Sequence, residues 1–126
     1  MVITGASSGM GKELAFRYAA RGCKVVIAAR RINQLNEIKT EIESKHSNCE
    51  VLAVETDVTK EEDAKRLIDT TIEKFKTIDY LILCAGISAH SLFEDFTDMA
   101  PFRKVVETNL YGCVYPTRFA LKHLKK

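Results

Sequence analysis

The sequence predicts an α/β fold in which helices cover a doubly wound parallel sheet. Three observations carry this prediction. Short runs rich in Val, Ile and Leu alternate with longer stretches of helical period, a glycine-rich turn joins the first run to the first helical stretch, and no repeat or linker interrupts the pattern. The 126 residues therefore fit one domain.

The first two strand-helix units occupy the amino-terminal third of the chain. A strand at residues 1–4 leads through the glycine turn into a helix at residues 10–21, and Gly22 is expected to cap the end of this helix. A second strand at residues 24–29 precedes a helix. The apolar stripe of that helix is formed by Ile32, Leu35, Ile38 and Ile42.

Two further units follow. A strand at residues 50–55 precedes a helix for which Thr59 and Glu62 predict a capping box. A fourth strand at residues 79–83 has the unbroken apolar run expected of a strand that is buried on both faces. After a looser segment at residues 86–98, one long helix is expected at residues 101–126, with Pro101 in its first turn and a kink at Pro116.

The strands are expected to lie in the order 3-2-1-4, which places a ligand crevice between strands one and four. In this order the outer edge of strand four is open and apolar. An open apolar edge readily pairs with another chain. We therefore expect this chain on its own to be marginally stable or to self-associate.

Composition excludes several classes of function. The formal charge of +2 is too small to predict a nucleic-acid or membrane partner. No apolar run approaches the roughly twenty residues of a membrane-spanning helix, so a cytoplasmic protein is expected, while an anchor upstream in a longer protein stays open. We expect no metal site, because His46, His90 and His123 lie on separate elements. The widely spaced cysteines are expected to be reduced, buried and intracellular; they are Cys23, Cys49, Cys84 and Cys113.

The strongest functional signal is the glycine spacing Gly5, Gly9, Gly11 between a strand and a helix. This spacing is typical of the dinucleotide-binding turn of a Rossmann-type fold: Gly5 permits a tight turn, Gly9 lets the backbone approach a pyrophosphate, and Gly11 lets helix and strand pack closely. A glycine turn without a ligand is the alternative. A nucleotide-triphosphatase loop is excluded, because Ala6 and Glu13 stand where that motif needs Gly and Ser or Thr.

The residues after the second strand indicate which cofactor is preferred. A carboxylate there would bind the ribose hydroxyl of NAD, whereas an arginine accommodates the extra phosphate of NADP. The sequence has Arg30 and Arg31 and no carboxylate at this place, so it predicts NADP(H) over NAD(H). The alternative is that both arginines are solvated residues at the start of a helix.

Four motifs in order resemble the short-chain dehydrogenase/reductase family over essentially the whole chain: the glycine turn, Asp57-Val58, Cys84-Ala85-Gly86 and Asn109. The resemblance implies contacts with the cofactor from Gly5, Ser7, Ser8, Gly9, Met10, Gly11, Arg30, Arg31, Asp57, Val58, Cys84, Ala85 and Gly86. Asp57 is equally explained as a turn residue, and both roles are compatible. Cys84 departs from the asparagine that the family usually has, so only the backbone role of that turn carries over.

The resemblance gives Asn109 a structural and catalytic role in a proton relay, and a hydrogen-bonded core asparagine is the alternative. The family also needs a serine and a tyrosine followed four residues later by a lysine. None of the tyrosines, Tyr18, Tyr80, Tyr111 and Tyr115, has a lysine four residues later. We therefore expect an incomplete domain at residues 1–126, inactive alone, whose catalytic carboxy-terminal half is absent.

Two branches of the family are the most similar, the 11β-hydroxysteroid dehydrogenase-like and 3-ketosphinganine reductase-like branches. They imply an oxidoreductase, a carbonyl reductase or alcohol dehydrogenase, with a small apolar substrate such as a steroid or lipid. The long last helix implies a homo-oligomer. A catalytically inactive module that binds NADP(H) or dimerises, and a remnant that does not fold, are the alternatives.

Overall fold

The computed structural model describes residues 1–125 as a parallel sheet between two layers of helices. The strands lie in the order β3-β2-β1-β4, which confirms the predicted fold class and strand order. In chain order the elements are β1 Val2–Thr4, α1 Gly9–Ala19, β2 Val25–Ala29, α2 Ile32–Lys45, β3 Val51–Glu55, α3 Glu61–Phe75, β4 Leu81–Leu83, the 3₁₀ turn η1 Phe93–Asp95, α4 Ala100–Val106, the π-helical segment η2 Glu107–Tyr111 and α5 Gly112–Leu124.

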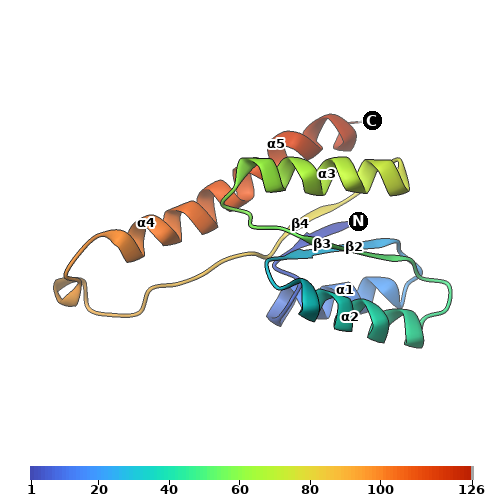
Figure 1. The fold of residues 1–126 in the computed structure, drawn as a ribbon, viewed down its shortest axis with the longest axis horizontal. Helices are drawn as coiled ribbons and strands as arrows, with labels where there is room; N and C mark the ends of the chain where they lie inside the picture. Colours follow the sequence, from blue (N-terminus) through green and yellow to red (C-terminus); the bar gives the residue numbers. More distant parts are fainter. Residues whose placement is uncertain (126) are drawn as a thin grey trace.

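Figure 1 shows α1 and α2 on one face of the sheet and α3 and α5 on the other. The central strand β2 is buried at all of its residues, as its β-branched run predicts for a parallel strand covered on both faces. Two apolar cores result. One lies between the sheet and α1 and α2, around Ile27 and Leu35, and the other lies under α3 and α5, around Val26 and Leu67.

The end of α1 follows the predicted cap. Gly22 has a φ of +76° and donates its N–H to the carbonyl of Ala19, while the N–H of Cys23 reaches the carbonyl of Tyr18. These two bonds form a Schellman motif, in which a residue with positive φ satisfies the last helical carbonyls. The glycine therefore sets the point at which the chain turns toward β2.

The predicted capping box before α3 is wrong. The helix begins at Glu61, and Thr59 donates its hydroxyl hydrogen to the carboxylate of Asp57 instead of capping the helix. The backbone N–H of Asp57 in turn donates to the carboxylate of Asp63. The reason is local, because an aspartate two residues before Thr59 offers an acceptor that competes with the helix.

The predicted double burial of the fourth strand is also wrong. Leu81–Leu83 are only half-buried, because within residues 1–125 β4 pairs with β1 alone and its other edge has no neighbouring strand. Tyr80, directly before β4, is 65% exposed.

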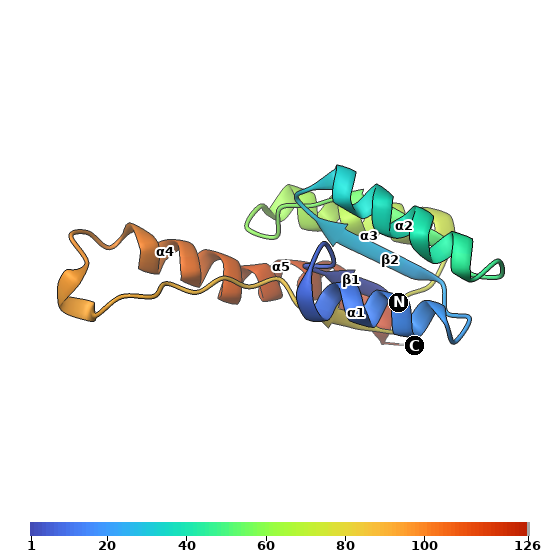
Figure 2. The ribbon, with the colours of Figure 1, turned by 90° about the horizontal axis from the view of Figure 1, so that it is seen from below.

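The predicted long helix is divided into three parts. The irregular segment is η2, upstream of Pro116, whereas α5 continues through Pro116, which is buried. Figures 1 and 2 both show α4 and the loop before it projecting from the body as an arm. At this arm the ring of Phe102 packs edge-on against Phe93 and Phe96. The predicted helix end at residue 126 lies outside the described residues.

Candidate cofactor-binding site

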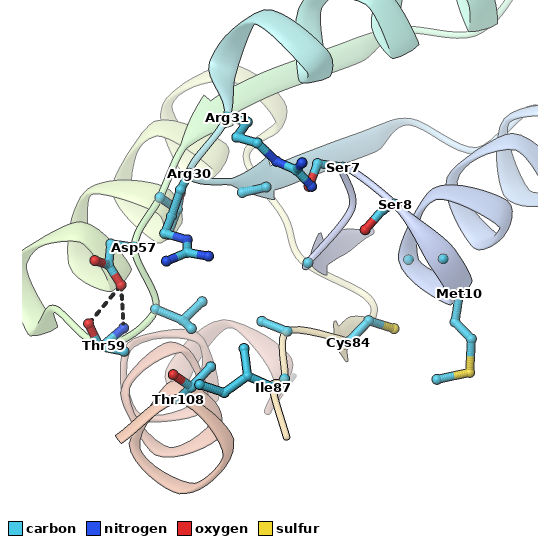
Figure 3. A pocket seen from close by; sticks show the side chains of 18 of the residues that line it. Ser7, Ser8, Met10, Arg30, Arg31, Asp57, Thr59, Cys84, Ile87 and Thr108 are labelled. Atoms are coloured by element: carbon cyan, nitrogen blue, oxygen red, sulfur yellow. Dashed lines mark hydrogen bonds between the residues drawn. The ribbon is translucent and has the colours of Figure 1, made fainter. Parts of the chain in front are cut away.

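A pocket of about 330 Å³ opens at the carboxyl ends of all four strands. Figure 3 shows its side chains converging from the loops that follow these strands and from the helix η2. Every residue that the sequence predicts to contact the cofactor lines this pocket; these are Gly5, Ser7, Ser8, Gly9, Met10, Gly11, Arg30, Arg31, Asp57, Val58, Cys84, Ala85 and Gly86. Asn109 is the one predicted site residue that is not part of the lining.

The glycines of the first turn serve different purposes. A Cβ on Gly5, whose φ is +64°, would lie 2.6 Å from the backbone nitrogen of Ala85, and a Cβ on Gly11 would lie 2.5 Å from the carbonyl oxygen of Gly5. Both positions therefore need glycine for the packing of the chain against itself. Gly9, with a φ of +55°, has nothing within 4 Å of its absent Cβ. Gly9, which lines the pocket, therefore has open space where its Cβ would be.

The amino end of α1 points its positive dipole end at the pocket. Gly9 begins the helix, the first turn contains no acidic residue, and the hydroxyl of Ser8 does not cap a backbone N–H. The free N–H groups and the helix dipole make such an end favourable for a bound anion. Ser7 adds a hydroxyl group beside it.

Arg30 and Arg31 follow β2 and form a cationic wall of the pocket. The guanidinium of Arg31 donates from Nη2 to Oγ of Ser7 over 3.2 Å, a contact that bridges the first and second strand ends. Of the pocket-lining residues, Arg30, Arg31 and Lys104 are cationic and Asp57 is the one carboxylate. The pocket therefore carries a net positive charge and favours an anionic ligand.

Asp57 and Val58 form the part of the wall that follows β3. The carboxylate of Asp57 accepts hydrogen bonds from the backbone N–H and the hydroxyl of Thr59, at 3.0 and 2.7 Å. Burial raises the pKa of Asp57, but these hydrogen bonds and the positive charges of Lys60 and Arg30 outweigh burial, so the pKa is lowered overall. Asp57 is therefore a turn residue and a pocket residue at once.

The turn after β4 is fixed to the first strand. The backbone N–H of Ala85 donates to the hydroxyl of the buried Thr4 over 3.4 Å. Burial raises the pKa of the Cys84 thiol, so this side chain stays protonated near neutral pH. The turn therefore offers backbone and a neutral side chain to the pocket.

Asn109 lies in η2 and ties this segment to the turn after β4. Its amide nitrogen donates to the carbonyl of Ile87 over 2.8 Å, and its amide oxygen accepts from the N–H of Ile87 over 2.9 Å. Asn109 is exposed, so the alternative of a core asparagine is wrong, although its amide is hydrogen-bonded. A π-helical turn at such a place is a frequent feature of functional sites.

Sequence reasoning missed several lining residues. Thr56 and Thr59 lie on either side of Asp57-Val58, the predicted cofactor contacts after β3. Their position next to this motif could have predicted that they line the pocket. No local sequence pattern indicated the other lining residues, which are Ile87, Lys104 and Thr108. Their approach to the pocket depends on the path of the loop at residues 88–99 and of the arm that follows it.

Residues 1–125 contain no group of three or more His, Cys, Asp or Glu side chains that could hold a metal ion. No described helix has both the length and the apolar content that crossing a membrane requires.

Comparison with known proteins gives matches along the whole chain. The short chain dehydrogenase family model matches residues 1–126. The 11-beta-hydroxysteroid dehydrogenase of Pinus massoniana is 41% identical over 126 residues, which are all of this chain and 35% of the relative. The 11-beta-hydroxysteroid dehydrogenase A of Arachis hypogaea is 44% identical over 125 residues, with 98% and 35% covered. The chain therefore spans about a third of the length of these relatives.

Solved structures share the fold. The alcohol dehydrogenase of the archaeon Thermococcus sibiricus, complexed with 5-hydroxy-NADP, superposes with a TM-score of 0.93 at 29% identity, covering 98% of this chain and 52% of that one. The L-sorbose reductase of Gluconobacter frateurii, complexed with NADPH and L-sorbose, gives a TM-score of 0.89 at 26% identity, covering 98% and 46%.

Proposed function

The chain belongs to the short-chain dehydrogenase family of oxidoreductases, and from this premise we propose that residues 1–126 are the cofactor-binding part of an NADP(H)-dependent carbonyl reductase or alcohol dehydrogenase. The observation that carries the proposal is the pair Arg30 and Arg31 at the end of β2, where no carboxylate stands. Planar guanidinium groups pair well with the extra phosphate of NADP. The free ribose hydroxyl of NAD does not require such a cationic partner. The alcohol dehydrogenase complexed with 5-hydroxy-NADP and the L-sorbose reductase complexed with NADPH support the same choice.

The pocket fits such a cofactor in three places. Open space beside Gly9 and the positive end of α1 suit the pyrophosphate. Val58, which is 7% exposed, offers an apolar surface beside the Asp57 carboxylate and suits the adenine ring. We place the nicotinamide ribose beside the Cys84–Gly86 turn, which lines the same pocket.

When bound, the nicotinamide group supplies or accepts a hydride. The residues of this chain bind and orient the cofactor, and Asn109 holds the backbone of Ile87, which lines the pocket. We place the serine, tyrosine and lysine that move the proton in the part of the relatives' length that this chain does not span. On this proposal residues 1–126 alone have no dehydrogenase activity.

We further propose a small apolar ketone or alcohol, such as a steroid or another lipid, as the substrate. The support is the name that the curated relatives carry, 11-beta-hydroxysteroid dehydrogenase, at about 40% identity. Reduction of a panel of steroid ketones and sugar ketones by the full natural protein tests this class. Turnover confined to the sugar ketones contradicts it.

Arg30→Asp is the direct test of cofactor choice. A hydrogen bond to a charged group contributes about 1.5–3 kcal/mol, so we expect NADPH affinity in the full natural protein to fall about 10- to 100-fold. NADH affinity should change little by comparison. Arg21→Asp, at the far end of α1, makes the same charge change outside the pocket and is the matched control. Equal losses for both cofactors in Arg30→Asp remove the argument for NADP(H).

The second candidate is a non-catalytic NADP(H)-binding module that pairs with a second copy. It is favoured by the apolar side chains that η2 and α5 leave exposed, namely Leu110, Tyr111, Val114 and Leu121, between 44 and 54% exposed. If this surface pairs, Val114→Glu should convert a dimer to a monomer in light scattering and leave NADPH binding intact. An unchanged dimer mass contradicts pairing at this surface.

A further inference from the structure

Two of the four cysteines lie together at the end of the sheet opposite the pocket. Cys23 stands two residues before β2, and Cys49 stands two residues before β3. The pocket lies at the carboxyl ends of the same strands. These two thiols therefore have no part in the cofactor site.

The strand register places the two cysteines opposite each other. Val25 pairs with Val51 in the parallel ladder. The pairing continues toward the amino ends, because the N–H of Val25 donates to the carbonyl of Glu50 over 3.0 Å and Lys24 forms an ion pair with Glu50 over 3.4 Å. The same register, continued by one residue, would place Cys23 opposite Cys49. Adjacent strands are about 4.8 Å apart, within the roughly 4.4–6.8 Å separation of Cα atoms that a disulfide requires.

Both side chains also lie on the same face of the sheet. Cys49 is part of the core beneath α1 and α2, and Cys23 packs against that core. The Sγ of Cys49 donates to the carbonyl of Cys23 over 3.2 Å, so the thiol of one residue already reaches the backbone of the other. Cys49 is 7% exposed, whereas Cys23 is only half-buried, so Cys23 is the more exposed of the two.

We propose that Cys23 and Cys49 are a redox-active dithiol that closes to an intramolecular disulfide when a small-molecule disulfide such as oxidised glutathione reaches Cys23. The thiolate of Cys23 attacks one sulfur of the small disulfide, whose S–S bond breaks and releases one small thiolate. The thiolate of Cys49 then attacks the sulfur of Cys23 and releases the second small thiolate. The protein pair loses two electrons, the small disulfide gains them, and the two thiol protons go to the released thiolates.

The surroundings of Cys49 set the pH dependence of the second step. Burial raises the pKa of the Cys49 thiol, and the nearby Glu43, Cys23 and Glu50 raise it further. Because only the thiolate attacks, ring closure should accelerate as the pH rises above neutral. Of these groups, Glu43 lies on α2, whereas Cys23 and Glu50 lie just before β2 and β3.

Closure should stabilise the fold without changing cofactor affinity. The bond would enclose β2 and α2 in one covalent loop, which restricts the unfolded chain. The whole length of β2 separates the bond from Arg30 and Arg31. The dithiol is therefore independent of the function proposed above.

The test uses the full natural protein, incubated with oxidised glutathione and then alkylated to trap free thiols. We expect a protein that carries two alkyl groups fewer than the alkylated reduced form, one proteolytic peptide pair linking Cys23 to Cys49, and a melting temperature several degrees above that of the reduced form. Cys49→Ser should accumulate glutathione on Cys23 instead of the linked pair. The matched control Cys113→Ser, which removes a cysteine on α5, should form the link as the natural protein does.

Two results overturn the proposal. The first is glutathione on Cys23 of the natural protein with no linked peptide, as in Cys49→Ser. The second is oxidation confined to Cys84 or Cys113. Both are read from the natural sequence, so the outcome does not depend on the folding of a variant. An NADPH affinity that is equal in the reduced and linked forms separates this result from any failure of the cofactor proposal.

Discussion

Gly112 connects the packing of α5 to the wall of the cofactor pocket. It has ordinary helical angles, φ −62° and ψ −18°, so alanine is unstrained there and should favour the helix by about 1 kcal/mol. The added Cβ, however, would lie 2.7 Å from Cγ2 and 3.3 Å from Cβ of Val58. Val58 is buried and β-branched, so it has little freedom to rotate away.

Overpacking of this kind costs about 1–3 kcal/mol, which exceeds the gain in helix propensity. We therefore expect Gly112→Ala to lower the free energy of unfolding by up to about 2 kcal/mol, which is the overpacking cost less the gain in helix propensity. Displacement of Val58 toward the pocket should also weaken NADPH binding several-fold. Val58→Ala removes the atoms that clash, so the double variant should be more stable than the sum of the two single changes predicts.

Urea unfolding of the full natural protein and the three variants measures this coupling, and fluorescence titration gives the NADPH affinity. We expect a coupling energy of at least about 1 kcal/mol between Gly112 and Val58. If the two changes add to within about 0.5 kcal/mol, the contact does not govern the position of Val58 and the reasoning fails.

Two further predictions concern the turns that line the pocket. Because the pKa of Asp57 is lowered in the folded protein, its ionised form adds stability above the unfolded carboxyl pKa of about 3.9, and this stability is lost as the pH falls through the folded pKa. Asp57→Asn should therefore flatten the acid side of the stability profile followed by urea unfolding, and an unchanged profile contradicts this. Gly5→Ala should destabilise the protein by about 1–3 kcal/mol more than Gly9→Ala, because both share the positive-φ cost and only Gly5 has a backbone atom 2.6 Å from the new Cβ. Equal urea midpoints for the two variants contradict the packing role of Gly5.

The parts of the fold that follow from local chemistry were predictable from the sequence. Alternating strand and helix periods give the sheet, and a single residue, Gly22, gives the end of α1. The predictions fail where two local interactions compete for the same side chain, or where the burial of a strand depends on residues far away in the sequence. Thr59 bonds to Asp57 rather than to the helix, and β4 is half-buried because burial requires a neighbour that its own residues cannot supply.

The pocket was predictable to a similar extent. A sequence motif predicts the pocket residues on short loops directly after strands, because the strand ends fix the position of these loops. Lys104 and Thr108 reach the pocket only because of the path of the arm, for which no local rule exists. The exposure of Asn109 likewise depends on what covers η2, not on the apolar residues beside it in sequence.

The glycines of the first turn show why a motif alone does not separate folding from binding. Gly5 and Gly11 lack room for a Cβ because other backbone atoms of the same chain stand within about 2.6 Å of it. Their absent side chains are explained without any ligand. At Gly9 only the positive φ favours glycine. No atom of the described chain lies within 4 Å of the position that a Cβ would take. Of the three positions, Gly9 is therefore the one at which a substitution should weaken cofactor binding more than folding, and the relative effects on NADPH affinity and unfolding in Gly9→Ala measure this difference.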